Sequence, residues 1–221
     1  MSMAIVMVTG ATGGIGSALV EMLRKRGDEV YGVGRDEQRL TALGVRPVVA
    51  DLARPETLEA AVPSVERLDV LVHNAGIVTL GKIADTPYHV WRDHLNVNLA
   101  AAAELTRLLL PALRAAQGQV VFVNSGAGFN AGPNWGAYAA SKFGLRALAD
   151  ALRAEERSLR VASIHPGRTA TEMQRSVRGQ EGAEYDPDEY IQPDTVARLI
   201  ITALDTTPDA ELIEMKVRYR I

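Results

Sequence analysis

The chain has 221 residues with a formal net charge of −3, and 47% of them are hydrophobic. This length suits one α/β domain with a substantial core, so we expect residues 1–221 to form a single domain. The slight acidity, without any basic block, makes nucleic acid and membranes poor partners. The chain has no cysteine, which excludes disulfides, and its four histidines lack metal-like spacing, so we expect no metal site. Without a secretory leader or a long apolar run, we expect a cytoplasmic protein.

Short apolar runs alternate with helical patterns along the chain. The runs are continuous rather than alternating with polar residues, which is typical of parallel strands buried on both faces. Most of the segments between them are long enough for a crossover helix. We therefore predict an α/β fold, a doubly wound (Rossmann) parallel sheet of about seven strands with helices on both faces. The predicted strands are 4–8, 29–33, 46–50, 68–72, 119–123, 160–164 and 211–217.

The first predicted strand ends in a glycine-rich turn, "TGATGGIG", at residues 9–16. Residues 15–23 then carry apolar side chains three and four apart, which indicates a helix. Such a turn lets the backbone approach a diphosphate, while the free N–H groups and dipole of the helix favour its negative charge. Glycines alone also fit a plain tight turn between a strand and a helix.

Residues with acid–base chemistry follow the fifth predicted strand. "YAASK" places Tyr138 and Lys142 four residues apart, so on a helix they share one face, where the ammonium can lower the pKa of the phenol. Ser125, in "VNSGAG", would lie at the carboxyl edge of the sheet, where its hydroxyl could polarise a carbonyl. Taken singly, each fits a structural role in the core, on the surface or in a cap. Together with a diphosphate-binding turn, they indicate a catalytic site.

The motif "HPGRTATEM" follows the sixth predicted strand, and we interpret its His165 as a packed loop residue. The next segment, 174–193, is polar, charged and poor in apolar periodicity. We predict that it is a substrate-loop excursion, either mobile near a ligand or simply solvated.

The glycine spacing G-x-x-x-G-x-G, followed in order by "HNAG", "VNSGAG", "YAASK" and "HPGRTATEM", resembles the short-chain dehydrogenase/reductase family. The resemblance extends from Val8 to about Met173. It implies that Tyr138 is the general acid/base of an enzyme that uses a nicotinamide cofactor. It also implies that Lys142 lowers the pKa of this tyrosine and holds the nicotinamide ribose, and that Ser125 orients the substrate.

Further site residues come from the same resemblance. Asn98, in "NVNLA", is similar to the family asparagine that helps to hold a proton-relay water. The glycine turn would hold the diphosphate, and Asp51 and Leu52 would contact the adenine. The segment after the fourth strand would lie along the adenosine ribose. Taken alone, Asp51 also fits a helix N-cap. The loop after the sixth strand would meet the nicotinamide. The cofactor-binding residues implied are Gly10, Thr12, Gly13, Gly14, Ile15, Gly16, Arg35, Asp51, Leu52, Asn74, Ala75, Gly76, Tyr138, Lys142, Pro166, Gly167, Thr169 and Thr171.

The choice between NADP(H) and NAD(H) depends on the end of the second predicted strand. A carboxylate there accepts from the ribose 2′-hydroxyl of NAD, whereas the 2′-phosphate of NADP requires a cation. The chain has Gly34 followed by Arg35, which favours NADP(H). NAD(H) stays possible, because Asp36 is a nearby carboxylate and the glycine turn, unlike that of many NADP-preferring relatives, has no basic residue.

We therefore predict an NADP(H)-dependent oxidoreductase that transfers a hydride between the nicotinamide and a carbonyl or alcohol substrate. The alternative is a non-catalytic redox sensor of the same fold that binds NADP(H), although it would not need Ser125, Tyr138 and Lys142. Predicted long helices at 88–114 and 136–157 resemble those through which relatives pair, which favours a homodimer or homotetramer. The apolar surfaces expected around the substrate are Phe129, Trp135, Met173 and Tyr185.

Overall fold

The computed structural model describes residues 3–207 and 209–220 and contains a seven-stranded parallel sheet in the order β3-β2-β1-β4-β5-β6-β7. This confirms the predicted fold class, and every strand overlaps its predicted range. The strands are β1 (Ile5–Thr9), β2 (Glu29–Gly34), β3 (Arg46–Val49), β4 (Val70–His73), β5 (Gln119–Val123), β6 (Arg160–Pro166) and β7 (Glu214–Val217).

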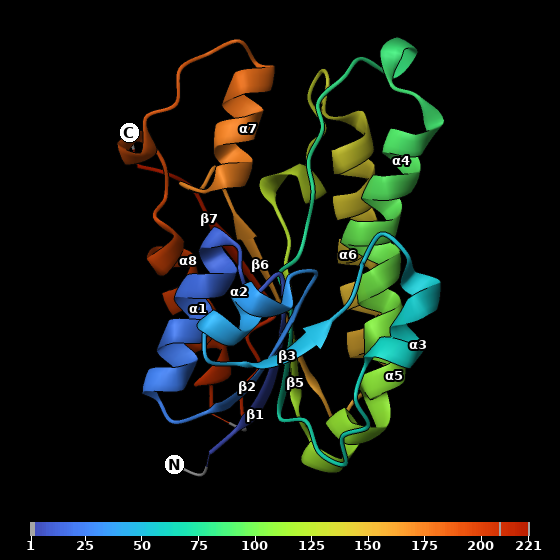
Figure 1. Ribbon diagram of the computed structural model, residues 1–221, viewed down its shortest axis with the longest axis vertical. Coiled ribbons are helices and arrows are strands. Elements are labelled where there is room, and N and C mark those ends of the chain that lie inside the picture. Colours follow the sequence, from blue (N-terminus) through green and yellow to red (C-terminus); the bar gives the residue numbers. More distant parts are fainter. Residues whose placement is uncertain (1–2, 208, 221) are drawn as a thin grey trace.

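Helices cover both faces of the sheet (Figure 1). On one face lie α1 (Gly14–Lys25), α2 (Glu37–Ala42) and α8 (Pro193–Leu204), and on the other α3 (Leu58–Ala61), α4 (Tyr88–Leu95), α5 (Ala101–Ala116) and α6 (Gly136–Glu155). The central strands β1, β4 and β5 are largely apolar because successive side chains point to opposite faces, and helices cover both faces. In β1, Val6 and Val8 join the core under α1 and α8, while Met7 joins the core under α5 and α6.

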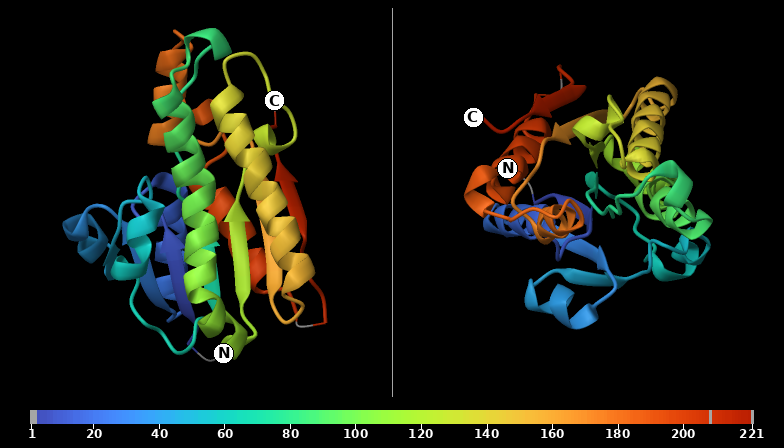
Figure 2. Two further views of the ribbon diagram at one scale, coloured as in Figure 1. Left: turned by 90° about the vertical axis from the view of Figure 1, so that its right-hand side faces the viewer. Right: turned by 90° about the horizontal axis from the view of Figure 1, so that it is seen from above.

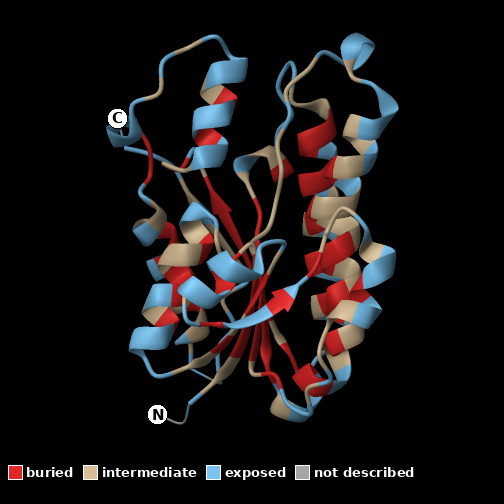
Figure 3. Ribbon diagram, viewed as in Figure 1, coloured by how far each residue is buried: buried red, intermediate tan, exposed pale blue. Residues whose placement is uncertain are grey.

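Burial follows this layered plan. The central strands are buried, whereas β3 at one edge of the sheet and the outward faces of the helices are largely exposed (Figure 3). The carboxyl ends of the parallel strands all meet at one edge, so residues that follow the strands gather there. Within the residues that the structure describes, no helix is both long and apolar enough to cross a membrane.

The single helix predicted over 88–114 is interrupted in the structure. Between α4 and α5 the chain forms a π-helical turn, Asn96–Ala100. A π turn inserts one extra residue into a helix and often marks a functional position. Here it carries the buried Asn98. Beside these two helices runs α6, as the left view of Figure 2 shows.

The segment 174–193 is more ordered than its polar composition suggested. Its first part belongs to α7 (Glu172–Gln180), which buries Gln174 and Val177. Only the remainder, with a short 3₁₀ turn, is loop-like. Helices α7 and α4 rise at the same end of the molecule, on opposite sides (Figure 1). Between them, Gln180 Oε1 accepts a hydrogen bond of 2.7 Å from the backbone N–H of Leu80.

Candidate active site

The glycine turn joins β1 to α1 in a conformation that only glycine tolerates at two positions. Gly10 has a φ of +64° and donates its N–H to Val33 O at 3.0 Å. A Cβ atom on Gly16 would lie 2.1 Å from Gly10 O, which forbids any side chain there. No side chain caps the start of α1, and its first turn has no acidic residue. Its N–H groups are therefore free of side-chain caps and suited to an anion. The predicted residues of this turn lie together: Gly10, Thr12, Gly13, Gly14, Ile15 and Gly16.

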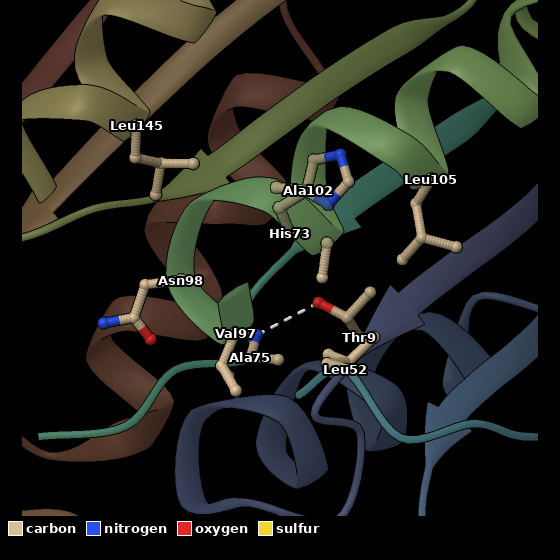
Figure 4. Close-up of a pocket in the computed structure, with 10 residues that line it drawn as sticks. Thr9, Leu52, His73, Ala75, Val97, Asn98, Ala102, Leu105 and Leu145 are labelled. Carbon is tan, nitrogen blue, oxygen red and sulfur yellow. Dashed lines mark hydrogen bonds between the residues drawn. The ribbon is translucent and has the colours of Figure 1, made fainter. Parts of the chain in front are cut away.

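The segment after β4 is fastened to this turn by polar contacts. Thr9 Oγ1 accepts from the backbone N–H groups of Asn74 and Ala75, both at 3.0 Å, and the second of these bonds is drawn in Figure 4. The Asn74 amide donates to the carbonyls of Thr9 and Gly10 at 3.1 and 3.2 Å. The Asn74 side chain thus fixes the glycine turn against the centre of the sheet.

A cavity of about 10 Å³, enough for roughly one water molecule, lies beneath this segment (Figure 4). Thr9, Leu52, His73 and Asn98 are among its lining residues. The His73 ring shares a hydrogen bond of 2.9 Å with Thr106, and burial lowers its pKa to about 3, so the ring is neutral at neutral pH. The Asp51 carboxylate accepts from the backbone N–H of the residue two positions ahead, and so caps a turn rather than a helix.

The end of β2 presents two cations. Arg35 is exposed, and Asp36 accepts from Arg39 N–H at 3.1 Å to cap α2. The Arg39 guanidinium donates to the carbonyl of Thr12, at 3.3 Å, and so lies against the glycine turn. Sequence reasoning missed Arg39, although its spacing of four residues from Arg35 at the start of a helix was a usable signal.

Tyr138 and Lys142 lie on one face of α6 as predicted, and Ser125 follows β5. Tyr138 is only 8% exposed and Lys142 only 3%. The Lys142 ammonium lies 5.8 Å from the centre of the Tyr138 ring and donates to Val123 O at 3.0 Å. The structure therefore brings a buried phenol, a buried amine and a half-buried hydroxyl into one site.

Burial dominates the pKa values of the two buried groups. Burial raises the pKa of Tyr138, and the hydrogen bond from the Ser125 hydroxyl acts in the opposite direction. Lys142, which donates to the Val123 carbonyl, is not among the causes of this shift, and its effect on the phenol stays a prediction. Burial also lowers the pKa of Lys142 to about 8. Tyr138 thus keeps its proton at neutral pH, and Lys142 keeps its charge there.

The Asn98 side chain forms hydrogen bonds with neighbouring residues. Its Oδ1 accepts from the backbone N–H of Ile77 at 2.8 Å, and its Nδ2 donates to Ile77 O at 3.0 Å and to Ser141 Oγ at 2.9 Å. Asn98 therefore fixes the loop that follows Gly76. A role in holding a water molecule stays a prediction.

The loop after β6 packs on the glycine turn. A Cβ atom on Gly14 would lie 2.7 Å from the Thr171 methyl group. The Thr171 hydroxyl caps α7 and donates to the carbonyl of Thr169, whose own hydroxyl donates to Gly167 O. This loop begins at Pro166, so all four predicted residues on the nicotinamide side lie in one segment beside the turn.

Two of the four expected pocket surfaces lie near Tyr138. The Trp135 ring is 5.6 Å from that of Tyr138, and the Met173 methyl group approaches Gly76. Tyr185 instead stacks on Tyr190. Phe129 packs against His165, so its ring also makes its contacts away from Tyr138. No group of three or more potential metal ligands occurs within residues 3–207 and 209–220.

Comparison with known proteins gives consistent matches. The family model described as short chain dehydrogenase matches residues 4–182. An uncharacterized short-chain type dehydrogenase/reductase of Sinorhizobium fredii is 33% identical over 96% of this chain and 90% of its own. A short chain dehydrogenase from Shigella flexneri complexed with NADP is 29% identical, with a TM-score of 0.86 over 96% of both chains. A serine dehydrogenase complexed with NADP⁺ is 25% identical, with a TM-score of 0.85 over 96% of this chain and 94% of its own.

Proposed function

The chain belongs to the short-chain dehydrogenase/reductase family of oxidoreductases, and from that premise we propose that it is an NADP(H)-dependent carbonyl reductase or alcohol dehydrogenase with Tyr138 as general acid/base. The observation that carries the proposal is the grouping of the buried Tyr138 and Lys142 with the half-buried Ser125, at the edge of the sheet where the glycine turn also lies. A sensor that only bound the cofactor would not need to bury a lysine beside a tyrosine, because burying an ammonium is costly.

The cofactor fits the residues present. The glycine turn closes tightly because Gly16 has no side chain that would collide with Gly10 O, and the start of α1 offers N–H groups without side-chain caps to a diphosphate. Lys142 and Tyr138 would hold the nicotinamide ribose, with Thr169 and Thr171 near the nicotinamide. When bound, the nicotinamide supplies the hydride or accepts it.

The protein's part in the reaction is to bind and protonate an oxygen. In reduction, Ser125 and Tyr138 donate hydrogen bonds to the substrate carbonyl oxygen, and Tyr138 then gives up its proton to the alkoxide. The raised pKa of Tyr138 ensures that the proton is present at neutral pH. The charged Lys142 and the Ser125 hydroxyl stabilise the phenolate that remains.

The arrangement at the end of β2 supports a preference for NADP(H) over NAD(H). Arg35 and Arg39 add two guanidinium groups near the turn, and Asp36 is occupied as the cap of α2. A 2′-phosphate requires cations, and guanidinium groups bind phosphate oxygens well. The two structural relatives named above carry NADP or NADP⁺.

Relatives of this family usually pair through long helices, and we extend that to this chain as a homodimer or homotetramer. Helix α6 exposes Phe143, and the neighbouring helix α4 exposes Tyr88 and Leu95. Exposed apolar side chains on adjacent helices suit a self-complementary interface. Sedimentation of the purified protein measures the assembly directly, and a monomer at micromolar concentration contradicts it.

The first test is a fluorescence titration with NADPH and, separately, with NADH. We expect NADPH to bind at least about tenfold tighter, an advantage that Arg35→Ala should reduce. Tighter binding of NADH would overturn the cofactor preference, and no binding of either would overturn the proposed function. Screening aldehydes and ketones with NADPH then tests catalysis. A redox sensor would bind NADPH but turn over no carbonyl compound.

A further inference from the structure

Behind Ser125 lies a buried histidine that the mechanism does not use. His165, near the end of β6, is only 2% exposed. Its Nδ1 lies 3.2 Å from the backbone carbonyl oxygen of Ser125. A carbonyl oxygen only accepts hydrogen bonds, so Nδ1 must carry the hydrogen. The ring therefore donates to the main chain of the residue that would orient the substrate.

The other ring nitrogen has no hydrogen bond of its own to the described residues. Among the residues that the structure describes, Nε2 is buried without a hydrogen-bond partner, and the Glu214 carboxylate of β7 lies 3.6 Å away. Burial lowers the pKa of His165 and outweighs the hydrogen bond to the Ser125 backbone and that carboxylate, which both raise it; Lys216 and Arg146 act in the same direction as burial. The neutral ring thus carries one N–H hydrogen, which it donates to the Ser125 carbonyl.

The same histidine also holds the far end of the short turn that carries Ser125. This turn runs through Gly126–Gly128 to Phe129, whose ring lies 4.5 Å from the His165 ring. Lys216 and Arg146 lie over the Phe129 ring at 3.5 and 4.3 Å. His165 therefore contacts the turn at its first and last residues.

We propose that His165 is a positioning residue that holds the Ser125 turn against β6, so that the Ser125 hydroxyl faces Tyr138. This inference rests on the proposed function, because it needs Ser125 to act on the substrate oxygen. A displacement of the Ser125 backbone would move its hydroxyl away from both the phenol and the substrate, and small displacements of a catalytic group reduce turnover strongly.

Two polar variants separate positioning from packing. In His165→Asn the amide nitrogen is bonded to Cγ, as Nδ1 is in histidine, so it can still donate to the Ser125 carbonyl. In His165→Gln the amide is one bond farther out and cannot occupy that position. His165→Leu removes the donor while keeping much of the apolar volume. Ser125→Ala measures how much turnover depends on the hydroxyl itself.

The assay follows NADPH oxidation with two activated carbonyl probes, para-nitrobenzaldehyde and diacetyl, together with NADPH affinity and thermal stability. We expect His165→Gln and His165→Leu to lower kcat roughly tenfold or more, with NADPH affinity unchanged, and His165→Asn to retain most of it. A structural role alone would make the Asn and Gln variants equally poor, in proportion to their loss of stability.

The outcomes are distinguishable. If Ser125→Ala loses turnover while His165→Gln keeps the wild-type kcat, the inference is wrong and the proposed function stands. Equal losses in the Asn and Gln variants also overturn it, because the donated hydrogen bond would then be irrelevant. If the wild-type protein reduces neither probe, or if Ser125→Ala is fully active, the proposed function fails and the inference fails with it. Should the Leu variant not fold, the Asn and Gln pair decides the matter.

Discussion

The glycine turn and the pocket around Tyr138 lie at the same edge of the sheet, yet they are built in opposite ways. The turn works by leaving out side chains: Gly10 and Gly16 allow the backbone to close, and the main-chain N–H groups at the start of α1 have no side-chain cap. The pocket works by burying polar side chains, including Lys142 and Tyr138, at the expense of their hydration.

This difference predicts how each region responds to change. In the turn, a substitution acts through steric clashes and backbone strain, so its effect depends on where the added atoms lie. In the pocket, a substitution acts through charge and proton transfer, so its effect falls on turnover rather than on binding. The following variants test this contrast.

The largest effect is expected for Tyr138→Phe, which removes the proton donor and little else. We expect kcat to fall by roughly a thousandfold, because general acid catalysis contributes on the order of 10²–10⁴ to a rate. NADPH affinity should stay within about threefold of wild type, since the ring still packs beside Trp135. Stopped-flow single turnovers and fluorescence titration measure the two quantities. A variant with wild-type turnover would remove Tyr138 from the chemistry.

Within the turn, Gly16→Ala and Gly13→Ala form a matched pair. The added Cβ at position 16 lies 2.1 Å from Gly10 O, whereas at position 13 it meets the same oxygen at 3.4 Å, an ordinary contact. We expect Gly16→Ala to weaken NADPH binding by about a hundredfold or to impair folding, and Gly13→Ala to bind with nearly wild-type affinity. Calorimetric titration with circular dichroism as a folding control measures both. Equal behaviour of the pair would refute the steric account.

The same contrast explains what the sequence could and could not predict. Continuous apolar runs predicted the strands, because strands buried on both faces need apolar residues at every position. The glycine turn was predictable because its tight backbone requires glycine at fixed positions, and this spacing can be read in the sequence. The π turn at Asn98 was not, since its extra residue depends on contacts with Ile77, which is distant in the chain.

Side-chain electrostatics were the least predictable feature. The spacing of Tyr138 and Lys142 placed them on one face, but only the structure shows that Lys142 donates to the Val123 carbonyl and that burial dominates the pKa of the phenol. Similarly, Arg39 approaches the turn through a tertiary contact with Thr12. Helix α7 formed in a segment whose polar composition indicated a loop, because burial of Val177 and a cap were sufficient.

A smaller effect is expected from the two cations beside the turn. Arg35→Ala and Arg39→Ala should each weaken NADPH binding by roughly tenfold and leave NADH binding unchanged, because only NADPH carries the 2′-phosphate. Arg24, which hydrogen-bonds Leu43 O on the outer surface, provides a matched control as Arg24→Ala. Raised ionic strength should weaken NADPH binding to wild type more than to either variant. An equal loss for both cofactors would assign the two arginines to folding instead.

The smallest effect, and the one with opposite signs in two measurements, concerns the titration of Lys142. In the folded protein burial lowers its pKa to about 8, from an ordinary value of 10.5. Between these two pH values the unfolded chain holds one proton more than the folded chain, so the contribution of this residue to the free energy of unfolding rises with pH. Turnover should move the other way, since a neutral amine no longer stabilises the phenolate, and kcat for reduction should fall as the pH passes about 8. Tyr138 keeps its proton across this window because its pKa is raised. Thermal unfolding and kcat, measured from about pH 7 to about pH 9, should therefore diverge in the wild type, and the rise in stability should be missing from Lys142→Met. If stability and turnover fell together, the titrating group would lie outside this pocket.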